Sequence, residues 1–203
     1  MASGWEKLRE SYFSDRVREK AILAASVESG GVAADIGAGT GFITEGLVRR
    51  GVKVIAVDES EKMLDELRRR IPVSGVERRV GSAERIPIED EAVDYVFANM
   101  LLHHVEEPSR AVREMARVLR PGGVVVITDL DSHEFEFLTT EQHDRWKGFE
   151  RESVSSRLRG AGLTNVTVES LGEDCCSKSS KGDAEATVSI FIASGRKPDR
   201  FTK

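Results

Sequence analysis

The chain has 203 residues, of which 39% are hydrophobic and 32% charged, and its formal net charge is −5. A chain of this length buries a sizeable core as one domain, and its acidic balance argues against a nucleic-acid partner. No apolar run approaches the roughly 20 residues of a membrane-spanning helix, and the charged first residues lack an apolar signal region. The two cysteines are adjacent and form no disulfide framework, so we expect a cytoplasmic protein. Because no apolar run could span a membrane, we expect no membrane partner.

A helical segment is predicted near the N-terminus, over residues 5–27. Its candidate inward positions are Trp5, Leu8, Tyr12, Phe13 and Val17. We therefore divide the chain into an N-terminal segment at 1–29 and a main domain at 30–203. The segment either packs on the main domain or caps its site, and the sequence leaves both readings open.

Short strand-like runs and helical segments then alternate along the chain. The strand-like runs cover 32–36, 53–57, 76–80, 93–97 and 123–128, and helical spacing covers 41–50, 60–70 and 108–119. Pro108 favours a helix start, and Pro121-Gly122-Gly123 stops that helix and turns the chain into a strand. The run 68–70, three arginines at a predicted helix end, complements the helix dipole. This alternation predicts a doubly wound α/β sheet.

The last forty residues follow a different pattern. After a helix that ends near 160–162, residues 163–171 and 186–195 each alternate apolar and polar side chains. The intervening segment 172–185 is too short for a confident crossover helix, so the two strands form an antiparallel pair. A mainly parallel sheet therefore ends in an antiparallel hairpin.

Three glycines in DIGAGTG, at 37, 39 and 41, follow the first predicted strand. A glycine-rich turn between a strand and a helix lets a ligand approach the backbone closely. The dinucleotide fingerprint needs a third glycine where Phe42 stands. Asp58 ends the second strand, in position to accept hydrogen bonds from ribose hydroxyls. Alternatively, Asp58 has only a structural role as a neighbour of a helix N-cap.

Four sequence blocks in the same order resemble the class I S-adenosylmethionine-dependent methyltransferases. They are VAADIGAGTG, AVDES followed by EKML, GSAERIPIEDEAVDYVFANMLLHHV, and REMARVLRPGGVVVITD. The resemblance covers roughly residues 30–197. It implies a seven-stranded Rossmann-like sheet, mostly parallel with an antiparallel C-terminal strand. It also implies S-adenosyl-L-methionine as cofactor and S-adenosyl-L-homocysteine as product.

The resemblance also assigns cofactor-binding residues. Those around the methionine part are Asp35, Gly37, Gly39 and Gly41, with Asn99 at the amino-acid end. Asp58 holds the ribose, and Met63 flanks the adenine. The segment Ser82-Ala83-Glu84 reaches the adenine, although many relatives have Asp where Ser82 stands, and Glu84 is the substitute acceptor.

The resemblance implies methyl transfer, a reaction that needs little covalent catalysis by the protein. The sulfonium cofactor is already activated, and positioning of the acceptor supplies much of the acceleration. If a base acts, His104 is the preferred residue and His103 its buried partner; a purely structural role for the pair is the alternative. A second polar cluster, Asp129, Asp131, His133 and Glu134, either lines an acceptor pocket or binds a metal, and we predict no metal.

The adjacent thiols at 175–176 lie in the predicted linker before the last strand. Either they have no role, or they bind a soft metal or metalloid together with His133 or His143. A small-molecule acceptor is favoured because the chain is acidic and compact and carries no appended recognition domain. Its methyl-accepting atom and the oligomeric state stay open. Two rival functions are a non-catalytic cofactor-binding sensor or partner module and an NAD-dependent oxidoreductase.

Overall fold

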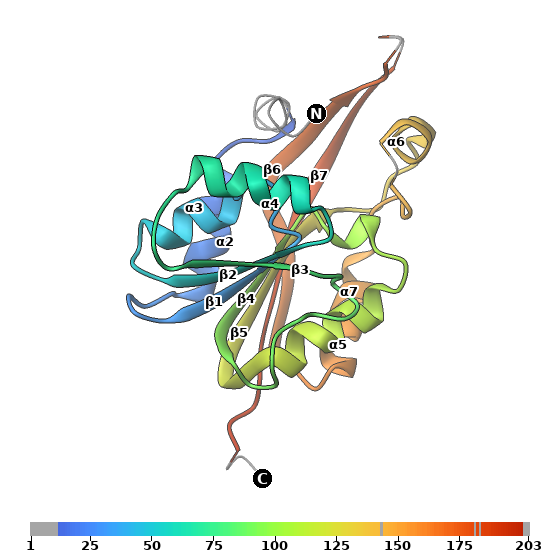
Figure 1. Ribbon diagram of the computed structural model, residues 1–203. Helices are drawn as coiled ribbons and strands as arrows, with labels where there is room; N and C mark the ends of the chain where they lie inside the picture. The colour runs from blue at the N-terminus through green and yellow to red at the C-terminus, as the bar shows by residue number, and fades with distance from the viewer. Residues whose placement is uncertain (1–11, 143, 181, 183, 201–203) are drawn as a thin grey trace.

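The computed structural model describes residues 12–142, 144–180, 182 and 184–200. Seven strands form one sheet in the order β3-β2-β1-β4-β5-β7-β6 (Figure 1). The strands are β1 (Val32–Ile36), β2 (Lys53–Asp58), β3 (Val76–Val80), β4 (Val93–Asn99), β5 (Leu119–Leu130), β6 (Thr164–Lys178) and β7 (Glu185–Arg196). The helices are α2 (Arg16–Ala25), α3 (Phe42–Val48), α4 (Glu61–Arg70), α5 (Pro108–Val118), α6 (Glu136–Glu141) and α7 (Arg151–Gly160), with a short 3₁₀ helix η2 (Leu102–His104).

Strand directions confirm the predicted fold. Strands β3, β2, β1, β4 and β5 are mutually parallel, whereas β7 pairs antiparallel with both β5 and β6. Parallel strands need crossover connections, which are usually helical; α3, α4 and α5 supply three of them, while residues 81–92 connect β3 to β4 without a helix. All the parallel strands therefore end at the same edge of the sheet, where the loops after β1, β2, β4 and β5 meet.

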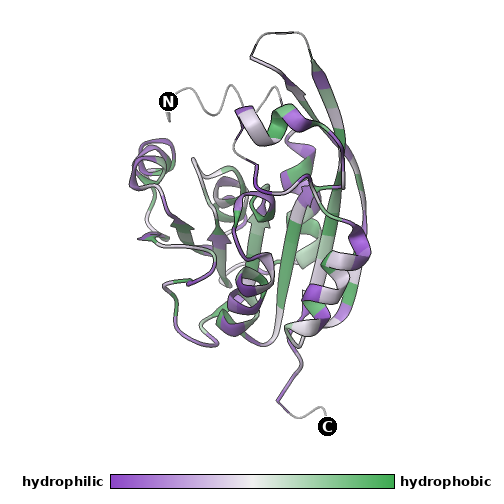
Figure 2. Ribbon diagram, turned by 90° about the vertical axis from the view of Figure 1, so that its right-hand side faces the viewer, coloured by the Kyte–Doolittle hydropathy of each residue, from purple (hydrophilic) through white to green (hydrophobic). Residues whose placement is uncertain are grey.

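Helices cover both faces of the sheet. Helices α5 and α7 pack on one face through Met115, Val154 and Leu158, while α2 and α3 pack on the other through Ile22 and Leu47. Figure 2 shows hydrophobic residues concentrated in the central strands and hydrophilic residues on the outer helices. A sheet buried on both faces accounts for the nearly continuous apolar runs of its central strands.

The helix ends follow the sequence signals. The side chain of Ser60 caps α4 by accepting a hydrogen bond from the Met63 backbone N–H. The predicted arginine run fills the last turn of α4, and Arg70 Nη1 also donates to the carbonyl of Thr40 at 2.8 Å. Pro108 begins α5 as predicted, whereas β5 begins at Leu119, before the predicted Pro-Gly-Gly turn.

The C-terminal hairpin is longer than predicted. Strands β6 and β7 stay paired from Asp174–Ser189 to Lys178–Glu185, so most of the predicted linker is strand and that prediction was wrong. A register shift between Ser170 and Asp174 separates this extension from the rest of the sheet. Figure 1 shows the extension projecting beyond the main body, near α6. Without a full core to cover, its strands carry small and polar residues that gave little strand signal.

The described part of the N-terminal segment packs on the main domain. Helix α2 buries Val17 and Ile22, and just before it Phe13 meets the ring of Phe42 edge to face at 5.5 Å. Tyr12 is half-buried, whereas Trp5 and Leu8 lie outside the described residues. Among the described residues, no helix is both long enough and apolar enough to cross a bilayer.

Candidate functional site

The glycine loop after β1 has the backbone that its sequence requires. Gly37, Gly39 and Gly41 have φ angles of +69°, +54° and +94°, in the left-handed region that side chains disfavour. A Cβ on Gly37 would lie 2.6 Å from Leu101 Cδ1, whereas one on Gly39 would meet nothing within 4 Å. The loop is therefore packed at Gly37 and open at Gly39, where a ligand can reach the backbone.

Asp35 shapes this loop from below. Its Oδ2 accepts hydrogen bonds from the Thr44 backbone N–H at 2.9 Å and the Thr44 hydroxyl at 2.6 Å. Burial raises the pKa of Asp35 to about 6, and the two Thr44 bonds oppose that shift. The carboxyl group thus ties the end of β1 to the first turn of α3.

Asp58 connects the glycine loop to the end of β2. Its Oδ2 accepts from the Gly39 backbone N–H and its Oδ1 from the Ser60 N–H, both at 2.8 Å. Burial raises the pKa of Asp58, and these two bonds oppose the shift. The bond to Ser60 means that Asp58 is a neighbour of the α4 cap, while its position also places it beside the open face of the loop.

These elements surround a first cavity of about 240 Å³, called here the loop cavity. Six of the predicted site residues line it: Gly37, Asp58, Ser82, Ala83, Glu84 and His104. The other six, Asp35, Gly39, Gly41, Met63, Asn99 and His103, are not among its lining residues. Three of the four sequence blocks, the first three, therefore converge on one cavity at the carboxyl ends of the strands, the usual place for a ligand in an open α/β sheet.

Two predicted adenine contacts have structural partners of their own. The Ser82 hydroxyl accepts from the Glu84 backbone N–H at 3.2 Å. One carboxylate oxygen of Glu84 accepts from the Glu107 N–H at 2.5 Å, at the N-cap of α5. Since each of these oxygens has a further lone pair, both groups keep the capacity to accept from a ligand.

Asn99 lies at the end of β4, outside the loop cavity lining. Its Oδ1 accepts from the Thr128 hydroxyl at 2.8 Å, which joins the ends of β4 and β5. The next residue, Met100, has a φ of +51° and begins the turn that leads into η2. In this structure Asn99 therefore holds two strand ends together.

The histidine pair in η2 is held from beneath by Asp129. The buried Asp129 carboxylate accepts from the Leu102 N–H at 2.7 Å and pairs with His103 Nδ1 at 2.6 Å. Burial lowers the pKa of His103, but the charge and hydrogen bond of Asp129 outweigh burial and leave that pKa raised. Burial alone would raise the pKa of Asp129, but the charge and hydrogen bond of His103 outweigh burial and leave the pKa of Asp129 lowered. The two form an oriented, charge-stabilised pair.

A second cavity of about 470 Å³, called here the hairpin cavity, lies beside the first. Apolar lining comes from Phe13, Met100, Leu138 and Val188, which belong to four segments far apart in the chain. His103 and His104 line it as well, and His104 lines both cavities. The histidines therefore stand where the two cavities meet.

Asp144 joins this site although no sequence motif indicated it. The carbonyl oxygen of His103 accepts from the backbone N–H groups of Arg145 and Trp146, at 2.8 and 3.2 Å. These bonds bring Asp144 Oδ1 to 3.8 Å from His103 Nε2 and 3.7 Å from His104 Nδ1. No local pattern could have indicated it, because the contact depends on a long-range backbone connection.

The predicted polar cluster after β5 is dispersed. Arg151 pairs with Asp131 at 2.6 Å, Glu134 points to solvent, and His133 Nδ1 accepts from the Phe135 N–H. No residue of the cluster lines the hairpin cavity, and Asp129 belongs to the site only through its contact with His103. Alternate strand positions and a following loop send the others in different directions.

The expected pair of accessible thiols on a loop is also wrong. Cys175 and Cys176 lie in β6, where adjacent side chains point to opposite faces. Cys175 lines the hairpin cavity and Cys176 is exposed. Burial raises the pKa of the Cys175 thiol to about 12, so it is protonated at neutral pH. The two sulfurs therefore do not form a joint thiolate trap.

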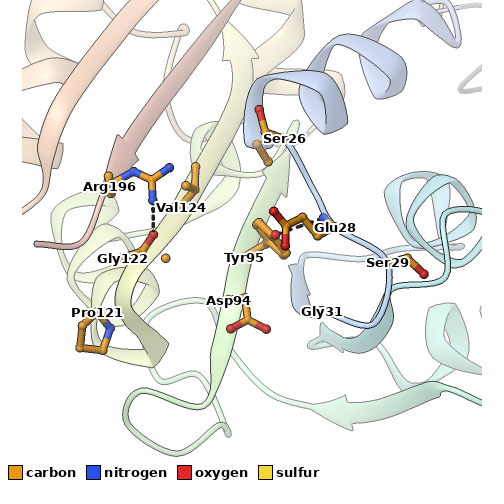
Figure 3. Close-up of a pocket in the computed structure, with 12 residues that line it drawn as sticks. Ser26, Glu28, Ser29, Gly31, Asp94, Tyr95, Pro121, Gly122, Val124 and Arg196 are labelled. Atoms are coloured by element: carbon orange, nitrogen blue, oxygen red, sulfur yellow. Dashed lines mark hydrogen bonds between the residues drawn. The ribbon is translucent and has the colours of Figure 1, made fainter. Parts of the chain in front are cut away.

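A third cavity, also of about 470 Å³, lies at the amino ends of the strands (Figure 3). There the Glu28 N–H donates to the Tyr95 hydroxyl at 3.1 Å, and Arg196 donates to the Gly122 carbonyl at 2.5 Å. Asp94 accepts from the Val32 N–H at 2.9 Å. This cavity lies at the opposite edge of the sheet from the glycine loop, and these bonds join the strands and turns that surround it.

Comparison with known proteins agrees with this geometry. A family model described as a methyltransferase domain matches residues 34–127. An uncharacterized methyltransferase of Mycobacterium tuberculosis strain H37Rv is 49% identical over 89 residues, which cover 44% of this chain and 35% of that protein. A demethylmenaquinone methyltransferase of Thermobifida fusca is 35% identical over 144 residues, 70% of this chain and 57% of the relative. The chain thus spans only about a third to three fifths of the length of these relatives.

Solved structures share the fold. The YcgJ protein of Bacillus subtilis superposes with a TM-score of 0.74 at 18% identity, over 92% of this chain and all of that one. A phosphoethanolamine N-methyltransferase of Haemonchus contortus, solved with phosphomonomethylethanolamine and S-adenosylhomocysteine, gives a TM-score of 0.74 at 18% identity. That match covers 90% of this chain and 52% of the other. With its sheet order, its glycine loop and the matched domain, the chain belongs to the class I S-adenosylmethionine-dependent methyltransferase family.

Proposed function

We propose that this protein transfers a methyl group from S-adenosyl-L-methionine to a small-molecule acceptor. The observation that carries the proposal is the shared position of His104, which lines both the loop cavity and the hairpin cavity. Two adjoining cavities, one built from the cofactor motifs and one largely apolar, are what a two-substrate transfer requires. The product of the cofactor is then S-adenosyl-L-homocysteine.

The residues of the loop cavity fit the cofactor. Gly39 leaves open space above the loop backbone, and the Asp58 carboxylate beside it has lone pairs left for the two ribose hydroxyls. The segment Ser82-Ala83-Glu84 lines the part of the cavity that we assign to adenine. Gly37, Gly41 and Asp35 hold the loop in shape, and we assign Asn99 and Met63 supporting places at its margins.

The bound cofactor supplies a sulfonium methyl group whose carbon accepts the acceptor's lone pair while the carbon–sulfur pair returns to sulfur. This chain contributes orientation and proton removal. Asp129 fixes the ring of His103 at the floor of the hairpin cavity, and His104 faces the boundary between the cavities. Where the acceptor must lose a proton, we assign that role to His104, with His103 as its buried partner.

The acceptor is proposed to be small and mainly apolar. A cavity of about 470 Å³ with Phe13, Leu138 and Val188 in its walls suits a compact organic molecule. Relatives include proteins named demethylmenaquinone methyltransferase and 2-methyl-6-phytyl-1,4-hydroquinone methyltransferase, names that indicate ring-containing acceptors. The formal charge of −5 disfavours a nucleic-acid acceptor.

The test measures cofactor binding and turnover separately. Calorimetric titration with S-adenosylhomocysteine is expected to give one saturable site. Isotope-labelled methyl from S-adenosylmethionine is then followed into a panel of phenols, hydroquinones, amines and thiols. Binding with no transfer to any acceptor would favour the non-catalytic module, and NADH binding without S-adenosylhomocysteine binding would favour an oxidoreductase.

A further inference from the structure

We propose that His103, His104 and Asp144 bind a divalent transition-metal ion of the zinc type where the two cavities meet. Each residue offers one ligand atom, and the three atoms lie within 4.8 Å of one another. Asp144 Oδ1 is 3.8 Å from His103 Nε2 and 3.7 Å from His104 Nδ1.

The surrounding structure orients the first of these ligands. Asp129 holds His103 at Nδ1, so the other ring nitrogen, Nε2, faces Asp144. A carboxylate on the far nitrogen of a histidine is the usual outer partner of a metal-binding imidazole, since it fixes the ring and raises its basicity. Asp129 is itself fixed by the backbone N–H groups of Leu102 and Leu130.

The second carboxylate is also placed by the backbone. The His103 carbonyl accepts from the N–H groups of Arg145 and Trp146, so the segment that carries Asp144 is attached directly to the histidine turn. Both His103 and Asp144 are buried. A cation held between them would offset part of the cost of burying the Asp144 carboxylate.

The donor set indicates which metal fits. Two imidazoles and one carboxylate form a common three-residue set for catalytic zinc, and they leave a coordination position for another ligand. Bonds of about 2.0–2.1 Å in a tetrahedron place neighbouring donor atoms about 3.3 Å apart, so each nitrogen must approach Asp144 by roughly 0.4–0.5 Å and the two nitrogens must approach each other by up to about 1.5 Å. His104, whose side chain is 43% exposed, has room for that movement.

The open position would face the acceptor. His104 lines both cavities, so a ligand of the ion lies at the boundary between the acceptor and the cofactor motifs. Provided that the proposed methyl transfer is correct, an acceptor hydroxyl or thiol bound there would release its proton to solvent and stay as the anion. With metal bound, His104 would serve as a ligand instead of a base, and the ion would lower the pKa of the acceptor so that water takes its proton.

The test is zinc affinity, measured by competition with a chromogenic chelator on metal-stripped protein. We expect the wild type to bind one equivalent of Zn²⁺, and His104→Ala and Asp144→Asn to weaken binding more than about 100-fold. The matched control is Glu141→Gln, which removes another carboxylate from the same cavity and should leave zinc affinity unchanged. A large excess of Mg²⁺ should displace little zinc, because imidazole ligands favour the transition metal.

Cobalt gives a second readout that does not depend on activity. Co²⁺ in the wild type should produce visible absorption that His104→Ala abolishes. A wild type that takes up no stoichiometric zinc, or a Glu141→Gln variant that loses as much affinity as Asp144→Asn, would overturn the site. If the protein transfers methyl groups but has no affinity for zinc, the metal site is refuted and the proposed function stands. If it binds zinc but transfers no methyl group, the metal site stands and the proposed function is refuted.

Discussion

Removing the Asp58 carboxylate should weaken cofactor binding, and the hydrogen bonds of Asp58 allow the loss of affinity to be estimated. The side chain of Asp58 accepts two backbone hydrogen bonds at 2.8 Å and lines the loop cavity. A hydrogen bond to a charged group contributes about 1.5–3 kcal/mol, so loss of the proposed ribose contact in Asp58→Ala should lower S-adenosylhomocysteine affinity about 10- to 150-fold. Calorimetric titration measures this change directly.

The same substitution also releases the Gly39 N–H, so a weaker complex alone does not identify the ribose contact. A double-mutant cycle separates the two effects: wild type and Asp58→Ala are each titrated with S-adenosylhomocysteine and with its 2′,3′-dideoxyribose analogue. If Asp58 binds the ribose hydroxyls, the substitution should cost much less affinity for the analogue. Glu59→Gln, which removes a neighbouring carboxylate of the same cavity, serves as the matched control.

Equal losses for both ligands would refute the ribose assignment. In that case Asp58 would act only by holding the loop through Gly39 and the α4 cap through Ser60. The urea midpoint of Asp58→Ala, measured alongside, shows how much of the change belongs to the fold. An unchanged affinity for S-adenosylhomocysteine would remove Asp58 from the site altogether.

Three further predictions address the loop and the thiols. Gly39→Ala should abolish S-adenosylhomocysteine binding in calorimetry, whereas Gly30→Ala, with a similarly strained φ of +87° and equally open space, should retain it. Because burial raises the pKa of Asp35 to about 6, the folded state holds the proton more tightly, and stability falls as pH rises from about 4 to 7. In urea unfolding, Asp35→Asn should remove about 3 kcal/mol of that fall, and an unchanged pH dependence would contradict it. Mass spectrometry after brief alkylation should find Cys176 modified and Cys175, with its pKa of about 12, largely intact; equal labelling would refute its burial.

The fold was predictable because its signals are local. Strand and helix periodicity, the glycines after β1 and the Pro-Gly-Gly after α5 each act within a few residues, and together they determine the order of elements. The motif residues Asp58, Ser82 and Glu84 then follow, because strand ends at one edge of a parallel sheet must converge. Position alone does not show which atoms are engaged: Asp35 and Asn99 are bonded to neighbouring strands and helices.

The second half of the site could not be predicted for a corresponding reason. Asp144 reaches the histidines through backbone bonds from Arg145 and Trp146 to His103, a contact across about forty residues that no spacing rule encodes. The hairpin extension was assigned to a linker because its residues are small and polar, although these residues face a cavity rather than a core. The wrong expectation for Cys175 has the same origin, because a strand points two adjacent side chains to opposite faces, whereas a loop can keep them together.

The two cavities differ in how they relate to the matched domain. Residues 34–127, which match the methyltransferase family, supply the glycine loop, Asp58 and both histidines of the pair. Most walls of the hairpin cavity, from residues 12–13, from α6 and from the tip of the hairpin, lie outside that range. The match to the family model therefore includes the proposed cofactor site and leaves most of the proposed acceptor site outside it. Acceptor choice in this protein should accordingly depend on these outer segments, which three distant parts of the chain contribute and which the histidines connect to the cofactor motifs.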